Sequence, residues 1–294
     1  MNEQEILIIS GATASGKSEL AKKIALKNNG VIINCDALQI YKNLPILSAQ
    51  PTKDDLKTVP HLLYSTLNYD QDSSVAIWLD LARSAIFSAT KVQQLPIIVG
   101  GSGLYIAALL EGLSPIPNID KKIREDARAL YEKIGREEFT KILFAQGDKN
   151  EQPTKLDKQR LIRRLEILEQ TGKTIDYWQN QPRKNHNNLG KFIHFNLEIK
   201  REILYQNCNR RFAAMVENGA VDEVKNFMKN NLDDNLPIAK TIGYLEIKNY
   251  LQNQNSKTAI IEKVQQRTRN YAKRQLTWFR NKFVFNNNDA QKYF

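Results

Sequence analysis

An apolar segment followed by a glycine-rich loop constrains the fold of this chain more than any other feature of its sequence. Residues 6–9 read ILII, and residues 11–18 read GATASGKS. The spacing of the two glycines, the lysine and the final hydroxyl is that of a phosphate-binding loop, which joins a buried strand to a helix. A structural turn without a ligand is the alternative, and the strand and helix patterns on either side of the loop argue against it.

The loop predicts a site for a diphosphate or triphosphate, because its backbone amides and the start of the next helix face an anion. We expect the lysine to reach the outer phosphate and the hydroxyl of Ser18 to bind Mg²⁺. The motif does not distinguish ATP from other phosphorylated ligands. The predicted binding residues are Gly11, Ala12, Thr13, Ala14, Ser15, Gly16, Lys17 and Ser18.

Hydrophobic periodicity divides the chain into three regions. Apolar runs at residues 6–9, 31–33 and 96–99 alternate with amphipathic stretches up to residue 112, which is typical of a buried parallel sheet. From residue 113 to 190 strand signals are missing, and residues 120–134, 136–145 and 157–170 have helical spacing. A strand pattern returns at 192–197, with helical patterns at 200–217, 221–229 and 257–282.

These patterns predict an α/β fold, a P-loop NTPase-like parallel sheet flanked by helices, with an all-helical insertion domain. The core comprises residues 1–112 and 191–294 with the C-terminal helices, and the insertion comprises residues 113–190. The asparagines at residues 286–288 predict a frayed end of the chain.

The charge balance favours a polyanionic partner. Lys and Arg number 43 against 32 for Asp and Glu, a formal charge of +11. No apolar run approaches the roughly 20 residues of a membrane-spanning helix, and the start of the chain lacks a signal-peptide pattern. We therefore expect a cytoplasmic protein, a monomer that does not bind membranes.

Cysteine and histidine spacing does not predict a metal centre. Cys35 and Cys208 form no Cys-x-x-Cys pair, so both are expected to be small buried side chains. His61, His186 and His194 have no metal-ligand spacing and are expected to be structural.

Two polar residues follow predicted strands and are candidates for chemistry. Asp36 follows the apolar run at 31–33, whereas the run at 95–99 continues into GGSG, with Ser102 and without a carboxylate. Since ligands bind at the carboxyl ends of strands in open α/β sheets, Asp36 and Ser102 should face the same cleft as the loop. The alternatives are that Asp36 only caps a turn and that Ser102 only caps a helix at 104–110.

Seven motifs, in order, resemble those of the tRNA dimethylallyltransferases, the tRNA isopentenyltransferase or IPP transferase family. They are GATASGKS, DALQIYK at 36–42, PHLL at 60–63, VGGSGLY at 99–105, DKQRLIRRLEI at 157–167, IGYLE at 242–246 and RNYAKRQLTWFR at 269–280. The resemblance implies a Mg²⁺-dependent prenyl transferase. It would move a dimethylallyl group from dimethylallyl diphosphate to N6 of the adenosine next to the anticodon, releasing diphosphate.

The resemblance also implies roles for individual residues. The glycine-rich loop would hold the diphosphate, Lys17 would assist catalysis, and Asp36 would be the base. Ser102 stands where the family usually has threonine and keeps the hydroxyl. Arg201 matches a family arginine that could bind the diphosphate, although a solvated arginine at a helix start is the alternative. Ala37 and Gln50 depart from a serine and a lysine that are common in the family.

RNA contacts are implied at the acceptor pocket, in the insertion and in the last helix. Helical spacing puts Leu161, Leu165 and Leu168 on one side, so Arg160, Arg163 and Arg164 should face outward. A solvated charged face is the alternative. In the last helix Trp278 and Phe279 are expected in the core. The implied tRNA-binding residues are Asp36, Ala37, Leu38, Gln39, Ser102, Arg124, Gln159, Arg160, Leu161, Ile162, Arg163 and Arg274.

Three other functions compete with this interpretation. A P-loop small-molecule kinase using ATP is disfavoured by the missing acid after residues 95–99. An adenine-nucleotide isopentenyltransferase is disfavoured by the long insertion and the basic last helix. An RNA-binding module with an inactive loop is disfavoured by the intact Lys17 and Ser18.

Overall fold

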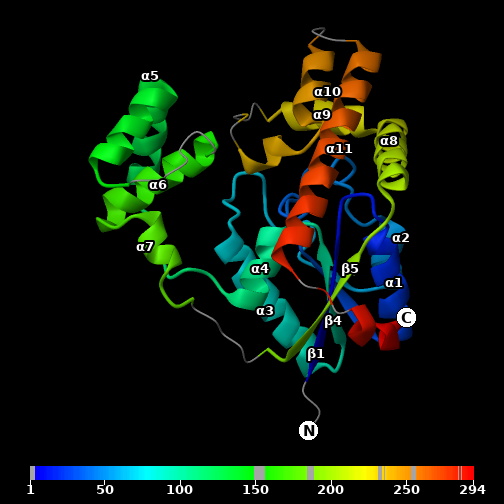
Figure 1. The fold of residues 1–294 in the computed structure, drawn as a ribbon. Helices are drawn as coiled ribbons and strands as arrows, with labels where there is room; N and C mark the ends of the chain where they lie inside the picture. The colour runs from blue at the N-terminus through cyan, green and yellow to red at the C-terminus, as the bar shows by residue number, and fades with distance from the viewer. Residues whose placement is uncertain are drawn as a thin grey trace. The chain divides into compact units, whose positions relative to one another are not determined.

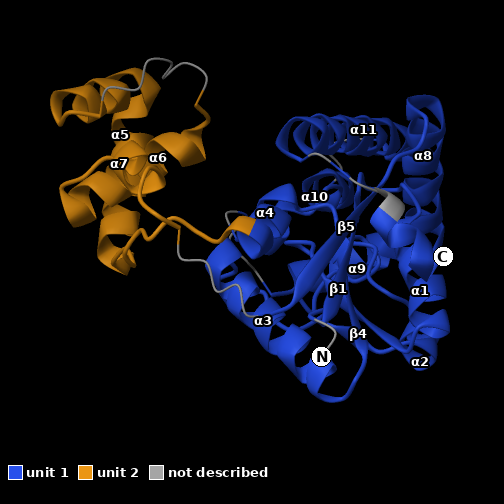
Figure 2. Cartoon of the chain, turned by 60° about the horizontal axis from the view of Figure 1, so that its bottom comes forward, with its two compact units in different colours: residues 1–110, 187–294 blue, residues 111–186 orange. Residues whose placement is uncertain are grey.

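The structure, a computed structural model, describes residues 4–148, 156–183, 189–230, 234, 236–252, 256–283, 285 and 287–294. The chain divides into two compact units (Figure 2). The first combines residues 1–110 with 187–294, and the second is the continuous segment 111–186. His186, expected to be structural, lies outside the described residues.

A five-stranded parallel sheet forms the centre of the first unit. Its strands are β1 (Glu5–Gly11), β2 (Gly30–Asn34), β3 (His61–Leu62), β4 (Leu95–Gly100) and β5 (Lys191–Leu197). The order across the sheet is β3-β2-β4-β1-β5, and all the pairs are parallel. The predicted α/β class and parallel sheet are confirmed, and the carboxyl ends of all five strands meet at one edge.

Helices cover both faces of this sheet, which explains why its strands are apolar on both sides. Helix α1 (Lys17–Lys27) and helix α3 (Val75–Lys91) lie on opposite faces (Figure 1). Leu7 and Ile9 of β1 pack in one cluster with Ile24 of α1. The apolar segment at the start of the chain is thus the middle of the core.

Among the residues that the structure describes, eight further elements belong to the first unit, and α4 ends at its boundary. They are α2 (Lys53–Thr58), α4 (Gly103–Glu111), α8 (Arg201–Glu217), α9 (Ala220–Met228), α10 (Tyr244–Leu251), α11 (Lys257–Lys282) and the 3₁₀ turns η2 (Pro237–Lys240) and η3 (Asn287–Tyr293). Ala12 of the glycine-rich loop packs with Cys208 of α8 and Ala272 of α11. Helices α8 and α11 therefore support the loop.

The last described residues fold back onto the sheet, and the prediction of a frayed end is wrong for them. Residue 286 lies outside the described residues, but η3 follows directly and Ala290 is fully buried. The hydroxyl of Tyr293 donates to Glu5 at 2.6 Å, and Lys292 pairs with the same carboxylate. The asparagines in this segment gave no sign that Ala290 and Tyr293 pack in the core cluster of the sheet.

The second unit is helical. It contains α5 (Lys121–Ala145), α6 (Lys158–Thr171) and α7 (Ile175–Gln179). Helix α5 is interrupted at Gly135 (φ 73°, ψ 179°), which agrees with two separate helical patterns on either side of that residue. Phe139 and Leu143 of α5 pack against Leu165 of α6 in the core of the unit.

Two smaller expectations concern membranes and cysteines. Over the described residues, the structure contains no helix that is both long and apolar enough to span a membrane. Cys35 and Cys208 are free thiols with buried side chains, as their spacing predicted.

Candidate active site

The glycine-rich loop, residues 11–18, crosses from the end of β1 to the start of α1 at the carboxyl edge of the sheet. Gly16 is the N-cap of α1 with φ 95°, a left-handed conformation that favours glycine, and no side chain caps the helix start. The first amides of α1 are therefore available to an anion. The ammonium of Lys17 donates to the carbonyl oxygen of Ala12 at 3.2 Å, so its side chain folds back over the loop.

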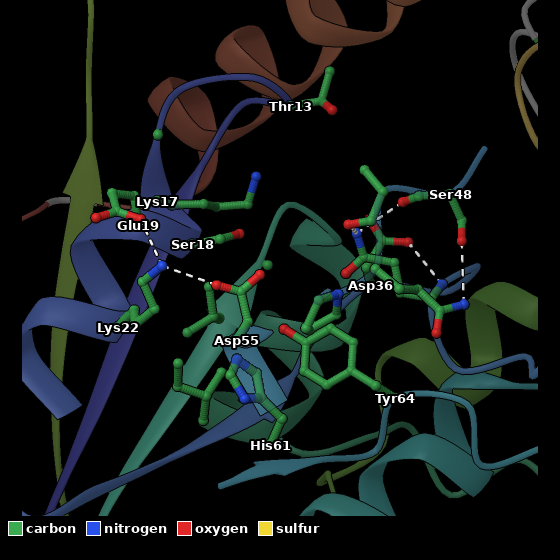
Figure 3. A pocket seen from close by; sticks show the side chains of 18 of the residues that line it. Thr13, Lys17, Ser18, Glu19, Lys22, Asp36, Ser48, Asp55, His61 and Tyr64 are labelled. Carbon is green, nitrogen blue, oxygen red and sulfur yellow. Dashed lines mark hydrogen bonds and ion pairs between the residues drawn. The ribbon is translucent and has the colours of Figure 1, made fainter. Parts of the chain in front are cut away.

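The loop forms one wall of a pocket that belongs entirely to the first unit (Figure 3). The pocket has a volume of about 380 Å³. Of the predicted residues, it brings together Thr13, Ala14, Gly16, Lys17 and Ser18 with Asp36 and Gln39. Of the residues predicted for the phosphate-binding loop, the diphosphate and the acceptor pocket, those that do not line it are Gly11, Ala12, Ser15, Ala37, Leu38, Ser102 and Arg201.

Asp36 caps a turn and also lines the pocket, so both a structural and a chemical role stay open for it. Its Oδ1 accepts hydrogen bonds from the backbone amides of Leu38 at 2.9 Å and Gln39 at 3.4 Å. The buried side chain of Asn34 accepts from the Asp36 amide at 2.9 Å and donates to the Asp36 carbonyl at 3.0 Å. Asn34, the last residue of β2, thus fixes the backbone of Asp36, a role that the sequence analysis missed.

Ser102 acts on the same turn from the neighbouring strand. Its hydroxyl oxygen accepts the backbone N–H of Ala37 at 3.2 Å. The ends of β2 and β4 come this close because Gly100 has no side chain: a Cβ there would lie 1.9 Å from the carbonyl oxygen of Cys35. The Ser102 hydroxyl therefore holds the backbone of Ala37, the residue next to Asp36. The backbone carbonyl of Ser102 accepts a hydrogen bond from the amide of Ile106 at the start of α4.

Arg211 lines the pocket, although the sequence analysis did not select it. It projects from α8, and its guanidinium donates to the hydroxyl oxygen of Thr13 at 2.6 Å. Arg201, which was selected, lies at the start of α8, donates to the hydroxyl of Tyr205 at 2.9 Å and stacks on that ring. Helical periodicity within α8 was the available signal, since Arg211 lies one turn beyond the buried Cys208.

Two partly buried cations, Lys17 and Arg211, lie at the loop. Burial, with Arg211 nearby, lowers the pKa of Lys17 to about 8. Burial also lowers the pKa of Arg211. The protein thus holds both positive charges in a place that disfavours them, and an anion bound at the loop would relieve that cost.

A third cation near the pocket is already neutralised. Lys22 of α1 pairs with Asp55 of α2 at 2.8 Å and with Glu19 at 3.1 Å. The hydrogen bond from Lys22 lowers the pKa of Asp55 to about 2. His61, beside them, donates from Nδ1 to the Val59 carbonyl at 2.8 Å, and burial lowers its pKa. His61 also lines the pocket, and its structural role stays a prediction.

Gln50, the departure from the family lysine, is engaged on both ends of its amide. Nε2 donates to the carbonyl of Tyr41 at 2.8 Å, and Oε1 accepts from the hydroxyl of Ser65 at 2.6 Å. Gln39 similarly donates to the carbonyls of Ser48 and Ala49, each at 2.9 Å. These amides fix the 36–50 segment without adding charge to the pocket.

The pocket suits a divalent cation that arrives with a phosphorylated ligand. Within the part of the chain that the structure describes, no group of three or more His, Cys, Asp or Glu side chains could hold a metal by itself. Mg²⁺ commonly takes one or two protein oxygens together with substrate phosphates and waters. Ser18 lines the pocket next to Lys17, so its hydroxyl fits that requirement.

Comparison with known proteins decides the family. The model of the IPP transferase family matches residues 39–282, and that of the isopentenyl transferases matches residues 4–66. A protein of Wolbachia pipientis subsp. Culex pipiens, named tRNA dimethylallyltransferase, is 41% identical over 284 residues, 96% of this chain and 94% of that protein. The chain belongs to the IPP transferase family.

Solved structures of the IPP transferase family have the same fold. The tRNA isopentenylpyrophosphate transferase of Bacillus halodurans aligns with a TM-score of 0.66 and 30% identity, over 95% of this chain and 88% of that one. A eukaryotic dimethylallyltransferase acting on tRNA aligns with a TM-score of 0.73 and 25% identity, over 94% of this chain and 69% of that one.

Only some of the residues that the family resemblance implied as RNA contacts in the second unit are exposed. Gln159 and Arg160 are exposed on α6, and Arg163 pairs with Glu166 at 2.9 Å. Leu161 and Ile162 are buried in the core of the unit, so their side chains do not face solvent. Arg124, in the first turn of α5, is partly buried.

Arg164 does not face outward, contrary to the expectation from helical spacing. It is buried and forms a two-pronged pair with Asp148, at 2.7 and 2.6 Å, and a further pair with Asp176. Two acidic partners from other segments of the unit explain why an arginine stays in the interior. The spacing alone gave no sign of them.

The last helix presents one of the implied RNA-binding arginines. Arg274 is exposed and lies over the ring of Tyr271, at 5.7 Å from its centroid. Phe279 is buried, as expected. Trp278 is partly buried, and its ring occupies the space that a Cβ at Gly103 would need.

Proposed function

We propose that this chain transfers the dimethylallyl group of dimethylallyl diphosphate to N6 of the adenosine next to the anticodon of tRNA, releasing diphosphate. One observation carries the assignment: Lys17 and Ser18 of the glycine-rich loop line the same pocket as Asp36. A site for an anionic leaving group and a candidate base are thus combined. The family membership and the names of the relatives support this reaction.

The loop serves the leaving group. As the bond between carbon and the bridging oxygen breaks, negative charge grows on the diphosphate. The amides at the start of α1, together with Lys17 and Arg211, are positioned to stabilise that charge. Mg²⁺ bound at the Ser18 hydroxyl would neutralise further charge on the diphosphate.

Asp36 serves the nucleophile. The lone pair of the exocyclic N6 is delocalised into the adenine ring, so attack is assisted when a base removes a proton as the new C–N bond forms. The turn amides of Leu38 and Gln39 hold the Asp36 carboxylate through Oδ1, and Asn34 fixes the Asp36 backbone. Ser102 holds the adjacent amide of Ala37 and thereby stabilises the same turn.

The exposed arginines supply candidate contacts to the RNA. Arg160 on α6 and Arg274 on α11 are exposed, and both belong to the motifs quoted above. We propose that Arg160 contacts the anticodon loop and that Arg274 contacts backbone phosphates. The excess of basic residues is consistent with an RNA substrate.

A free adenine nucleotide is the second candidate acceptor, because the isopentenyl transferase model matches the segment that carries the loop and Asp36. The test is to incubate the protein with labelled dimethylallyl diphosphate and Mg²⁺, and with either tRNA or AMP. We expect label in tRNA alone and no consumption of added ATP. Label in AMP alone would assign the nucleotide reaction, and rapid ATP hydrolysis would refute the transferase assignment.

A further inference from the structure

Gln275 of α11 is a buried amide to which the proposed chemistry gives no role. Its side chain is within the RNYAKRQLTWFR motif, and the residue is 6% exposed. Oε1 accepts the backbone N–H of Thr13 at 2.7 Å, and Nε2 donates to the carbonyl oxygen of Gly101 at 2.9 Å. Both ends of the amide are therefore bonded to backbone groups of two different loops.

These two loops carry the two halves of the site. Thr13 belongs to the glycine-rich loop, and Arg211 donates to its hydroxyl. Gly101 precedes Ser102, whose hydroxyl receives the amide of Ala37 next to Asp36. One side chain thus connects the loop proposed for the leaving group with the segment that supports the proposed base.

The amide of Gln275 packs closely against Gly101, with no room for a side chain at that position. A Cβ on Gly101 would lie 2.2 Å from Nε2 of Gln275 and 3.1 Å from the carbonyl oxygen of Gly11. The two loops are therefore in close contact, and the amide fills the gap beside them. A neutral side chain with an acceptor and a donor at its end satisfies both backbone groups, and glutamine has the length to reach them from α11.

We propose that Gln275 is a positioning residue that sets the distance between the bound diphosphate and the carboxylate of Asp36. The inference rests on the proposed transfer reaction. Misplacement of reacting groups by about 1 Å can slow a reaction about 10²-fold. Affinity for the donor depends instead on the amides at the start of α1, on Lys17 and on Arg211, and neither printed hydrogen bond of Gln275 goes to these groups. Its loss should therefore affect the rate of transfer more than donor binding.

The first test replaces the amide by a side chain of similar length without polar ends. We expect Gln275→Met to lower the single-turnover rate of tRNA prenylation about 10- to 100-fold, with the KM for dimethylallyl diphosphate close to wild type. Gln265→Met is the matched control: Gln265 lies on the same helix and donates to the carbonyl of Asn209 at 3.3 Å, which belongs to neither loop. It should retain the wild-type rate.

A second variant removes only the hydrogen bond to the Gly101 carbonyl and leaves an acceptor for the Thr13 amide. Gln275→Glu keeps the length and can still accept from Thr13, but its carboxylate has no donor for the Gly101 carbonyl. We expect it to remain slow. Thermal unfolding of all three variants gives the folded fraction, to which each rate is referred. A wild-type rate per folded molecule in Gln275→Met would overturn the proposal, and so would an equal loss of rate in Gln265→Met.

Hydrogen exchange supplies a readout that needs no prenyl transfer. In Gln275→Met, peptides covering residues 11–18 and 100–105 should exchange faster together, whereas Gln265→Met should leave both unchanged. If the wild-type protein does not prenylate tRNA, the proposed function fails, and the exchange rates still show whether Gln275 ties the loops. Unchanged exchange in both peptides would overturn the role of Gln275 even in an active enzyme.

Discussion

Arg211 donates a hydrogen bond to the hydroxyl of Thr13 at 2.6 Å, which fixes a guanidinium from α8 onto the glycine-rich loop. Hydrogen bonds that involve a charged group contribute about 1.5–3 kcal/mol. Arg211→Gln should therefore raise the KM for dimethylallyl diphosphate about 10- to 100-fold. Arg201→Gln is the control, since Arg201 stacks on Tyr205 outside the pocket. A larger loss in Arg201→Gln would return the diphosphate role to that residue.

Asp36→Asn tests the proposed base with little structural change. An asparagine can still accept from the amide of Leu38, so the turn should persist. The single-turnover rate should fall about 10²- to 10⁴-fold, the usual range for a lost general base, while donor and tRNA affinities remain. Asp55→Asn is the comparison, because Asp55 lines the same pocket but pairs with Lys22. A near-wild-type rate in Asp36→Asn would leave Asp36 with its capping role alone.

The pKa of Lys17 predicts how donor binding depends on pH. Burial lowers this pKa to about 8, so the ammonium is charged below that pH and becomes neutral above it. Affinity for dimethylallyl diphosphate should therefore weaken as the pH rises from 8 towards 9.5, measured by titration calorimetry. Lys17→Met should bind more weakly overall, without this decline. Constant wild-type affinity across the interval would contradict the prediction.

His194 predicts a loss of stability in mild acid. Its ring packs against Phe283 and Phe285, and burial lowers its pKa from 6.5 to about 4. Because the unfolded state binds the proton more tightly, the free energy of unfolding should fall as the pH drops from about 6.5 to 4. The contribution is on the order of 2–3 kcal/mol. Urea unfolding at several pH values should show a smaller decline for His194→Gln than for the wild type.

Arg274 predicts a change in the salt dependence of RNA binding. If it contacts a phosphate, Arg274→Ala should reduce the slope of log affinity against log salt by roughly 0.7–0.9. Lys292→Ala is the control, since Lys292 pairs with Glu5 at the amino end of the sheet. Titrations of an anticodon stem-loop at several salt concentrations measure both slopes. An unchanged slope in Arg274→Ala would show that the Arg274 guanidinium does not contact a phosphate of the RNA.

The features that the sequence predicted well are local ones. The loop from 11 to 18, the strand before it and the helix after it follow from residue spacing, and the parallel sheet follows from apolar runs of strand length. Asp36 was identified because parallel strands end at one edge. Each of these conclusions needs only neighbouring residues and a general rule of topology.

The missed features depend on partners that are distant along the chain. Arg164 is interior because Asp148 and Asp176 come to it, and Arg211 reaches the pocket because α8 packs beside the loop. Asn34 and Gln275 act through backbone groups, which leave no pattern in side-chain chemistry. The family resemblance pointed to Arg201 as the diphosphate-binding arginine, whereas in the folded protein Arg211 is the arginine that contacts the loop.

The pairing of β1 with β5 has a consequence for synthesis of the chain. The segment 111–186 is translated between these strands and is continuous, so its own core can close as soon as it leaves the ribosome. Strand β1 meanwhile has β4 on one side and no neighbour on the other until Lys191–Leu197 has been made. An open strand edge can pair with other chains. The nascent protein therefore passes through a period in which one edge of the buried, apolar strand β1 is open to pairing with other chains.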